Sequence, residues 1–113
     1  MENCLFCKII KGEIPSAKVY ENEHVYAFRD INPQAPTHVL VIPRTHVPSL
    51  DALDDLPDDE LTACLRAISE IAKQEKLEKG YRVVSNCGPD ACQSVPHLHF
   101  HILGGTQMAD RMA

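Results

Sequence analysis

The sequence predicts an α+β fold in which an antiparallel sheet of about five strands packs with one long helix. Two observations predict it. Short segments rich in β-branched and aromatic residues are separated by turn residues, and one longer segment repeats apolar residues at helical spacing. A chain of 113 residues without internal repeats or a linker has room for one compact domain, so we expect residues 1–113 to form a single domain.

The first half of the chain contains three segments with strand character. Lys18–Glu21 and His24–Asp30 are separated by the Asn22-Glu23 turn, and this pattern predicts a hairpin. His38–Ile42 predicts a third strand, which Pro43 ends because proline has no backbone N–H to donate within a sheet.

The segment from about Asp58 to Lys79 predicts the long helix. Its apolar residues fall along one side of a helix, at Leu61, Leu65, Ile68, Ile71 and Ala72. Acidic residues in the first turn and lysines in the last turn complement the helix dipole. Gly80 is expected to end the helix, and Cys64 is expected to be a small buried hydrophobic residue.

The last two predicted strands are Tyr81–Asn86 and His97–Leu103, and the second carries the strongest functional signal. Side chains alternate between the faces of a strand, so one face receives three histidines and the other receives apolar residues. The histidines are His97, His99 and His101, and the apolar residues are Leu98, Phe100 and Ile102. A lone strand histidine is most often an ordinary surface residue, but three in alternation indicate a functional site.

Two kinds of site fit this pattern. His-x-His on a strand is a common way to present two imidazoles to a metal ion. The preceding segments Asn86-Cys87-Gly88 and Gln93-Ser94-Val95 add a hydroxyl, an amide and backbone N–H groups, which suit an anionic phosphoryl group. We favour phosphoryl chemistry and retain the metal site as the alternative.

His97–Leu103 resembles the His-φ-His-φ-His-φ-φ motif of the histidine-triad (HIT) family, where φ is hydrophobic. Four further segments resemble the branch that hydrolyses nucleoside phosphoramidates: Phe28–His38, Val41-Ile42-Pro43, Gly80-Tyr81-Arg82 and Gln93-Ser94-Val95. The resemblance covers nearly the whole chain. It implies one HIT domain over residues 1–113, a short N-terminal helix in addition to the long one, and a sheet that continues across a two-fold dimer.

The resemblance also implies catalytic roles. The middle histidine, His99, is expected to form a nucleotidyl intermediate, while the carbonyl of His97 orients its ring and His101 donates to the phosphate. His38 resembles the family histidine that lies beside the nucleophile. Ser94 resembles the serine whose hydroxyl contacts the phosphate or the leaving group.

A nucleotide-binding surface follows from the same resemblance. Asp30 resembles the carboxylate that binds the ribose hydroxyls, and Asn86 resembles the polar residue that partners Ser94 from the preceding strand. The positions that resemble the lining of the nucleobase pocket are Phe6, Ile9, Ile14, Phe28, Ile31 and Leu40. Without the resemblance, each would be assigned to the core or to the surface.

The activity implied is hydrolysis of purine nucleoside phosphoramidates, which releases a nucleoside monophosphate. The alternatives are a dinucleoside polyphosphate hydrolase and a non-catalytic nucleotide- or zinc-binding regulator. Ser94 and the Gly104-Gly105 ending resemble the phosphoramidase branch more closely. The sequence departs from that branch at Cys92, where glycine is common, and in its non-aromatic C-terminal tail, and both departures bear on the choice of leaving group.

Cys4 and Cys7 form a C-x-x-C pair, which is typical of a redox pair or of half a zinc site. A thioredoxin-like redox pair follows a strand of a βαβ unit, which this sequence does not predict. His46 and His97 complete a Cys2His2 set, and bacterial HIT members with a similar N-terminus imply the same ligands. We expect one structural zinc ion per chain, with free thiols and then a redox pair as alternatives.

The net charge and the lack of long apolar segments exclude several classes of binding partner. The net charge of −5 argues against a DNA or RNA binder, which needs a basic surface. No apolar run approaches the roughly 20 residues that span a bilayer, and Met1–Cys4 do not begin a secretory signal, so we expect a cytoplasmic protein without a membrane partner. A homodimer is expected through the long helix and the strand near Tyr81–Asn86, because pairing two sheet edges covers both.

Overall fold

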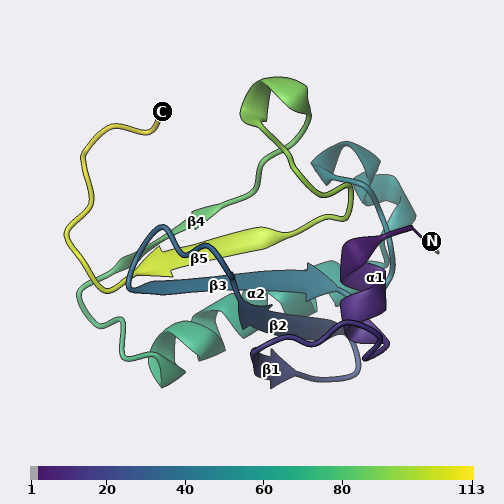
Figure 1. Ribbon diagram of the computed structural model, residues 1–113, viewed down its shortest axis with the longest axis horizontal. Coiled ribbons are helices and arrows are strands. Elements are labelled where there is room, and N and C mark those ends of the chain that lie inside the picture. The colour runs from purple at the N-terminus through teal and green to yellow at the C-terminus, as the bar shows by residue number, and fades with distance from the viewer. Residues whose placement is uncertain (1–2) are drawn as a thin grey trace.

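The computed structural model describes residues 3–113 and contains one five-stranded antiparallel sheet in the order β1-β2-β3-β5-β4 (Figure 1). Met1 and Glu2, the start of the segment tested for a secretory signal, lie outside the described residues. The elements are α1 (Leu5–Ile10), β1 (Lys18–Glu21), β2 (Val25–Arg29), β3 (Thr37–Pro43), α2 (Asp58–Gln74), β4 (Tyr81–Val84) and β5 (Phe100–Gly104). The predicted fold class is confirmed, including the short N-terminal helix.

Strands β3 and β5 form the centre of the sheet and carry two of the predicted site histidines. Leu40 pairs with His101, and Val39 pairs with Ile102. Directly paired residues of antiparallel strands project to the same face, as do residues two apart along a strand. His38, Leu40 and His101 therefore share one face, while Val39 and Ile102 share the other.

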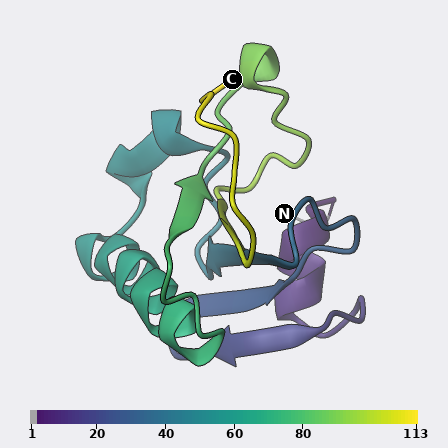
Figure 2. The same ribbon diagram turned by 90° about the vertical axis from the view of Figure 1, so that its left-hand side faces the viewer.

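Each face of the sheet is covered by a different helix, with α2 on one side and α1 on the other (Figure 2). Buried residues on the α2 side include Val39, Val41, Cys64, Ile71, Phe100 and Ile102. Those on the α1 side include Phe6, Ile9, Tyr26, Phe28, Leu40 and Ile42. Both faces are thus apolar, and the site histidines occupy positions that would otherwise belong to the α1-side core. Cys64 is fully buried, as predicted.

Helix α2 begins as predicted but ends at Gln74, so the predicted end at Lys79 is wrong. Lys76 adopts a left-handed backbone with φ of 58°. The amide of Leu77 donates to the carbonyl of Ala72 at 3.0 Å, which is the bond of a Schellman motif. This turn directs Leu77 back against the α2-side core, and that contact replaces further helix.

Strand β5 begins at Phe100, so the prediction of a strand from His97 is too long. The amide of Leu98 donates to the carbonyl of Val47 at 2.8 Å, which is a loop residue and not a strand neighbour. The predicted alternation of side chains nevertheless holds. Leu98 lies in the α2-side core, whereas the ring of His99 faces α1.

The observed ends of β3 and β4 differ from the predicted ends by one or two residues. β4 ends at Val84 and not at Asn86, and β3 includes Pro43, which pairs with β2 at the strand end. The connections within residues 3–113 form 3₁₀ helices at Leu50–Asp55 and Pro89–Ala91. In this described part of the chain, no helix has both the length and the apolar character that a membrane crossing requires.

Candidate functional site

Histidine rings from three segments of the chain lie next to one another on the α1 side of the sheet. Neighbouring rings have centroids 5.0–5.9 Å apart, in the order His46, His97, Phe6, His99, His101 and His38. The single phenylalanine in this imidazole row comes from α1 and packs edge-on against the histidines on either side of it. The fold therefore brings all three triad histidines together with two histidines from the β3 region.

The middle triad histidine is held by the backbone. The Nδ1 of His99 donates to the carbonyl oxygen of His97 at 2.7 Å. A carbonyl accepts and cannot donate, so Nδ1 must carry the proton of the neutral ring. The lone pair is then on Nε2. His99 is buried, and its ring is in the tautomer that a nucleophilic imidazole needs.

Hydrogen bonds also determine which ring nitrogen is protonated in His38 and in His101. The backbone N–H of Gln34 donates to Nδ1 of His38 at 3.0 Å, so the neutral ring carries its proton on Nε2. That Nε2 donates to Nδ1 of His101 at 2.9 Å, which leaves the proton of His101 on its own Nε2. Within residues 3–113, the Nε2 of His101 is the one buried side-chain nitrogen or oxygen without a hydrogen-bond partner.

These two rings are neutral at pH 7. Burial, together with the nearby rings of His99 and His38, lowers the pKa of His101 to about 4. Burial also lowers the pKa of His38, although Asp30, whose oxygen lies 3.5 Å from Nε2, opposes this effect. Burial removes the water that would solvate a charged imidazole, and this explains why the pKa of each ring is lowered. His101 therefore presents a neutral N–H donor.

A second cluster lies at the other end of the imidazole row. The Nδ1 of His97 is 3.3 Å from Sγ of Cys4, 3.6 Å from Sγ of Cys7 and 3.2 Å from Nδ1 of His46. The Nε2 of His97 donates to the carbonyl of Pro43 at 2.9 Å, so its Nδ1 lone pair is directed at the sulfur atoms. One ligand atom from each of the four side chains lies within 4.8 Å of the others.

Helix α1 places the two cysteines. Cys4 is the N-cap of α1, and its Sγ accepts from the amide of Cys7 at 3.3 Å. Burial, together with the neighbouring Cys4, raises the pKa of the Cys7 thiol to about 11. Burial lowers the pKa of His97 to about 4. Both groups are therefore neutral at pH 7, and a bound cation would draw the proton from the thiol.

The other residues predicted around the triad differ in burial and in their contacts with it. Asp30 is half-buried beside His38. Ile31, next to it, is 91% exposed. Asn86 is half-buried and Ser94 is exposed, and neither side chain makes a hydrogen bond among the described residues. The geometry thus brings Asp30 to the imidazole row, whereas roles for Asn86 and Ser94 stay predictions.

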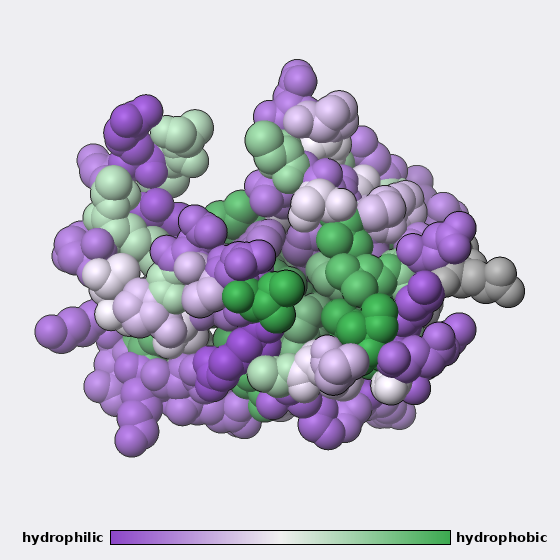
Figure 3. All heavy atoms as spheres, in the orientation of Figure 1, coloured by the Kyte–Doolittle hydropathy of each residue, from purple (hydrophilic) through white to green (hydrophobic). Residues whose placement is uncertain are grey.

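The hydrophobic residues predicted to line a nucleobase pocket gather on the α1 side. Phe6, Ile9, Phe28 and Leu40 are buried there, and Ile14 packs at the margin. On this face, hydrophobic side chains reach the surface beside α1 (Figure 3). They form an apolar wall next to the imidazole row, because Phe6 belongs to both.

Sequence analysis missed two backbone groups that fix the rings, the amide of Gln34 and the carbonyl of Pro43. Every residue carries such groups, so residue identity gives no signal for them. The side chain of Gln93, in one of the two segments expected to supply donors for a phosphoryl group, is already occupied. Its Nε2 donates to the carbonyls of Pro48 at 2.7 Å and Val95 at 3.0 Å, and its Oε1 accepts from the amide of Gly88, so it joins its own loop to the segment after β3.

A hollow of about 560 Å³ lies between residues 76–82 and 105–108, and no predicted site residue lines it. Beside it, the C-terminal tail is attached to β4 by Arg82. That guanidinium donates to the carbonyls of Ala109 at 3.0 Å and Arg111 at 3.4 Å. The tail therefore belongs to the β4 edge of the molecule.

Comparison with known proteins gives consistent matches. A family model described as the HIT domain matches residues 11–108. The 14 kDa zinc-binding protein of Zea mays is 55% identical over 106 residues, which cover 92% of this chain and 83% of that protein. The purine nucleoside phosphoramidase of Escherichia coli (strain K12) is 41% identical over 113 residues, which cover 99% of this chain and 95% of that protein.

Solved structures agree with this result. A HIT family hydrolase from Clostridium thermocellum superposes with a TM-score of 0.95 at 45% sequence identity. The superposition covers 100% of this chain and 99% of that one. The similarity therefore extends over the sheet, both helices and both ends of the imidazole row.

Proposed function

Because the chain belongs to the HIT-domain family and is a hydrolase of that family, we propose that it hydrolyses purine nucleoside phosphoramidates through a nucleotidyl intermediate on His99. The Nε2 of His99 attacks phosphorus, and the P–N bond breaks as the amine leaves with a proton. Water then attacks phosphorus, releases the nucleoside monophosphate and restores the imidazole. The observation that carries this proposal is the 2.7 Å bond from Nδ1 to the His97 carbonyl, which leaves Nε2 unprotonated.

His101 would stabilise the charge that develops on the phosphoryl oxygens. Its Nε2–H is buried without a partner, and such a donor gains most when an anionic oxygen meets it in a water-poor site. The chain from the Gln34 amide through His38 keeps that proton in place. We assign His101 as the phosphate donor and His38 as the residue that fixes its tautomer.

The remaining predicted residues complete the substrate site. Asp30 accepts from the ribose hydroxyls, and Asn86 contacts the substrate from the β4 side. Ser94, which is exposed, passes a proton to the leaving amine. Ile31 and the apolar wall beside α1 pack against the purine, since an apolar side chain as exposed as that of Ile31 gains from a planar ring that covers it.

We propose that Cys4, Cys7, His46 and His97 hold one structural zinc ion. Zinc bond lengths of about 2.3 Å to sulfur and 2.05 Å to nitrogen place tetrahedral ligand atoms roughly 3.3–3.8 Å apart. The distances from Nδ1 of His97 to the other three ligand atoms are 3.2–3.6 Å, so the donor set fits. The maize relative is a protein named for zinc binding, which supports the same ion. Zinc would link α1, the segment after β3 and the triad, and would not contact substrate.

We also propose a two-fold homodimer. β4 is an edge strand of the sheet, and its Tyr81 and Val83 are each 42% exposed. Leu65 on α2 is 54% exposed, although it was predicted on the apolar side of that helix. A second copy of the chain that paired with β4 would cover these residues. Val83→Lys should yield a monomer by light scattering, and a wild-type mass near 12.6 kDa would contradict the dimer.

The proposed small-molecule partner is a purine nucleotide or nucleoside phosphoramidate, without DNA, RNA or a membrane, and the proposed location is cytoplasmic. The net charge of −5 supports the exclusion of nucleic acids.

The reaction is tested by trapping its intermediate. Quench of the enzyme in alkaline denaturant, which preserves the P–N bond to histidine, after reaction with a purine nucleoside phosphoramidate labelled in its nucleotide part should leave label on His99, identified by peptide mass spectrometry. The same quench with a dinucleoside polyphosphate separates the two hydrolase classes, because the better substrate accumulates the adduct at lower concentration. Binding of nucleotide without any adduct or product release would contradict a hydrolase mechanism on His99.

A further inference from the structure

Glu60, in the first turn of α2, is the one buried acidic side chain among residues 3–113, with 6% of its surface exposed. One carboxylate oxygen accepts from the backbone N–H of Thr45, and the other accepts from the Thr45 hydroxyl at 2.7 Å. Burial of a carboxylate is costly unless hydrogen bonds satisfy it. Both of these bonds go to a single residue, and that residue immediately precedes His46.

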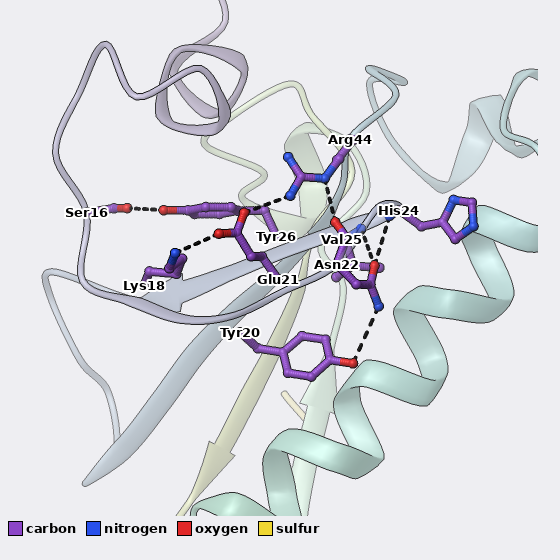
Figure 4. A network of polar contacts seen from close by, with 9 residues as sticks. All are labelled: Ser16, Lys18, Tyr20, Glu21, Asn22, His24, Val25, Tyr26 and Arg44. Atoms are coloured by element: carbon purple, nitrogen blue, oxygen red, sulfur yellow. Dashed lines mark hydrogen bonds and ion pairs between the residues drawn. The ribbon is translucent and has the colours of Figure 1, made fainter.

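Residues on both sides of His46 are held by hydrogen bonds to other parts of the fold. The carbonyl of Pro43 accepts from the His97 ring, and the carbonyl of Val47 accepts from the amide of Leu98. Arg44 bonds to the β1–β2 hairpin, with its Nε donating to the carbonyl of Asn22 and an NH2 group donating to Glu21, both at 2.8 Å (Figure 4).

These attachments differ in strength. The bond between Arg44 and Glu21 is exposed, and exposed ion pairs contribute little. The bonds between Glu60 and Thr45 are shielded, and hydrogen bonds to a charged acceptor are stronger than neutral ones. The Glu60 contact is therefore the attachment that fixes the backbone directly before His46.

We propose that Glu60 is a positioning residue for the zinc site: it orients the Thr45-His46 backbone so that Nδ1 of His46 meets Cys4, Cys7 and His97 at ligand distance. The inference rests on the proposed zinc site and adds α2 to the elements that build it. Residues that orient metal ligands commonly change metal affinity by about 10- to 100-fold when they are removed. Loss of Glu60 should therefore weaken zinc binding and alter ligand geometry.

The experiment measures metal binding on the full chain. Zinc affinity is determined by competition with a chromophoric chelator, and the visible spectrum of the cobalt(II) form reports ligand geometry. The variants are Glu60→Ala, Glu60→Gln and Thr45→Val, with Glu70→Ala on the exposed side of α2 as the matched control. Zinc affinity should fall by about 10- to 100-fold in Glu60→Ala and by about 3- to 10-fold in the other two, because Thr45→Val keeps only the bond to the backbone N–H and Glu60→Gln replaces the charged acceptor with a neutral amide. The control should match wild type.

A purely structural role for Glu60 would lower the melting temperatures of the zinc-free and zinc-loaded protein equally and leave affinity and spectrum unchanged, and that result overturns the proposal. If Glu60→Ala does not fold, Glu60→Gln and Thr45→Val decide, and wild-type affinity in both overturns it. A wild-type protein that binds neither zinc nor cobalt overturns the zinc site and this proposal together. Wild-type binding with unaffected variants overturns the Glu60 proposal alone.

Discussion

The two ends of the imidazole row use the same side chain in opposite ways. At the His38 end, the contact between the His38 and His101 rings contains a proton, because the donor Nε2 of His38 faces the acceptor Nδ1 of His101. At the His97 end, an unprotonated nitrogen faces two sulfur atoms and a second imidazole nitrogen. The first arrangement is complete without an added ion. In the second, the proposed zinc ion would lie between the ligand atoms and add its binding energy to the stability of the fold.

His97 belongs to both arrangements through different atoms. Its ring Nδ1 faces the cysteines, while its backbone carbonyl accepts from His99. A histidine within the triad therefore need not do the chemistry of its neighbours. Here one residue contributes a side chain to the proposed metal site and a carbonyl to the proposed nucleophile.

The largest expected effect comes from removing the nucleophile. His99→Ala should lower kcat by at least about 1,000-fold, because it removes the atom that bonds to phosphorus. Nucleotide affinity and zinc content should not change, since His99 supplies no proposed metal ligand. Steady-state kinetics and isothermal titration measure these quantities. His24→Ala, a histidine on the β1–β2 turn, is the control, and turnover within tenfold of wild type in His99→Ala would refute the mechanism.

Zinc removal should act mainly on stability. At a zinc concentration about 1,000 times its dissociation constant, binding stabilises the fold by about 4 kcal/mol, which for a domain of this size is roughly 15 °C in Tm. A chelator, or Cys4→Ser, should lower Tm by that order. The loss of kcat should stay within about tenfold, because the Pro43 carbonyl still holds the His97 ring. Cys92→Ser, an exposed thiol, serves as the control in calorimetry. An unchanged Tm after chelation contradicts the site.

Substitutions at the His38 end of the imidazole row should lower activity less than His99→Ala does. His101→Ala should lower kcat/KM by about 100-fold, which is typical for loss of one donor to a developing charge. His38→Ala should cost about tenfold, because His101 keeps its ring but loses the bond that selects its tautomer. Zinc content should match wild type in both variants. If His38→Ala proved more damaging than His101→Ala, the assigned order of donor and positioning residue would be wrong.

The smallest effect concerns pH and stability. The pKa of His101 is lowered to about 4 in the folded protein from an ordinary value of 6.5, so the unfolded chain binds this proton first as pH falls. Its contribution to stability is therefore present above pH 6.5 and is lost between pH 6.5 and about 4. In zinc-free protein, urea unfolding at pH 7 and pH 4.5 should show about 1 kcal/mol less pH-dependent loss in His101→Gln than in wild type. Equal losses would mean that His101 is not buried as a neutral ring.

The sequence was sufficient for features that depend on periodicity. Alternation along His97–Leu103 placed apolar and histidine side chains on opposite faces, and it did so even though the strand itself begins only at Phe100. The C-x-x-C spacing and the start of α2 were equally visible. The end of α2 was not, because Lys76 takes the left-handed conformation that usually marks a glycine.

Other parts of the site depend on contacts that no local pattern encodes. The Gln34 amide and Pro43 carbonyl are backbone groups brought to the rings by the path of the chain. Glu60 did carry a signal, since it lies four residues before the buried Cys64 and therefore on the apolar side of α2. The acidic run at the helix start offered a simpler explanation through the helix dipole, and this concealed the signal.

The central pairing of β3 with β5 also determines when the protein can become functional during synthesis. Both ends of the imidazole row need residues from the last fifth of the chain, and β5 reaches β3 only after the intervening helix and β4 have been made. Contacts of such high sequence separation form late in folding. Cys4 and Cys7 are synthesised first, so they are exposed for the longest time before His97 is available to pack against them. The interval of translation is therefore the period in which these thiols are most open to oxidation, and a reducing compartment protects them.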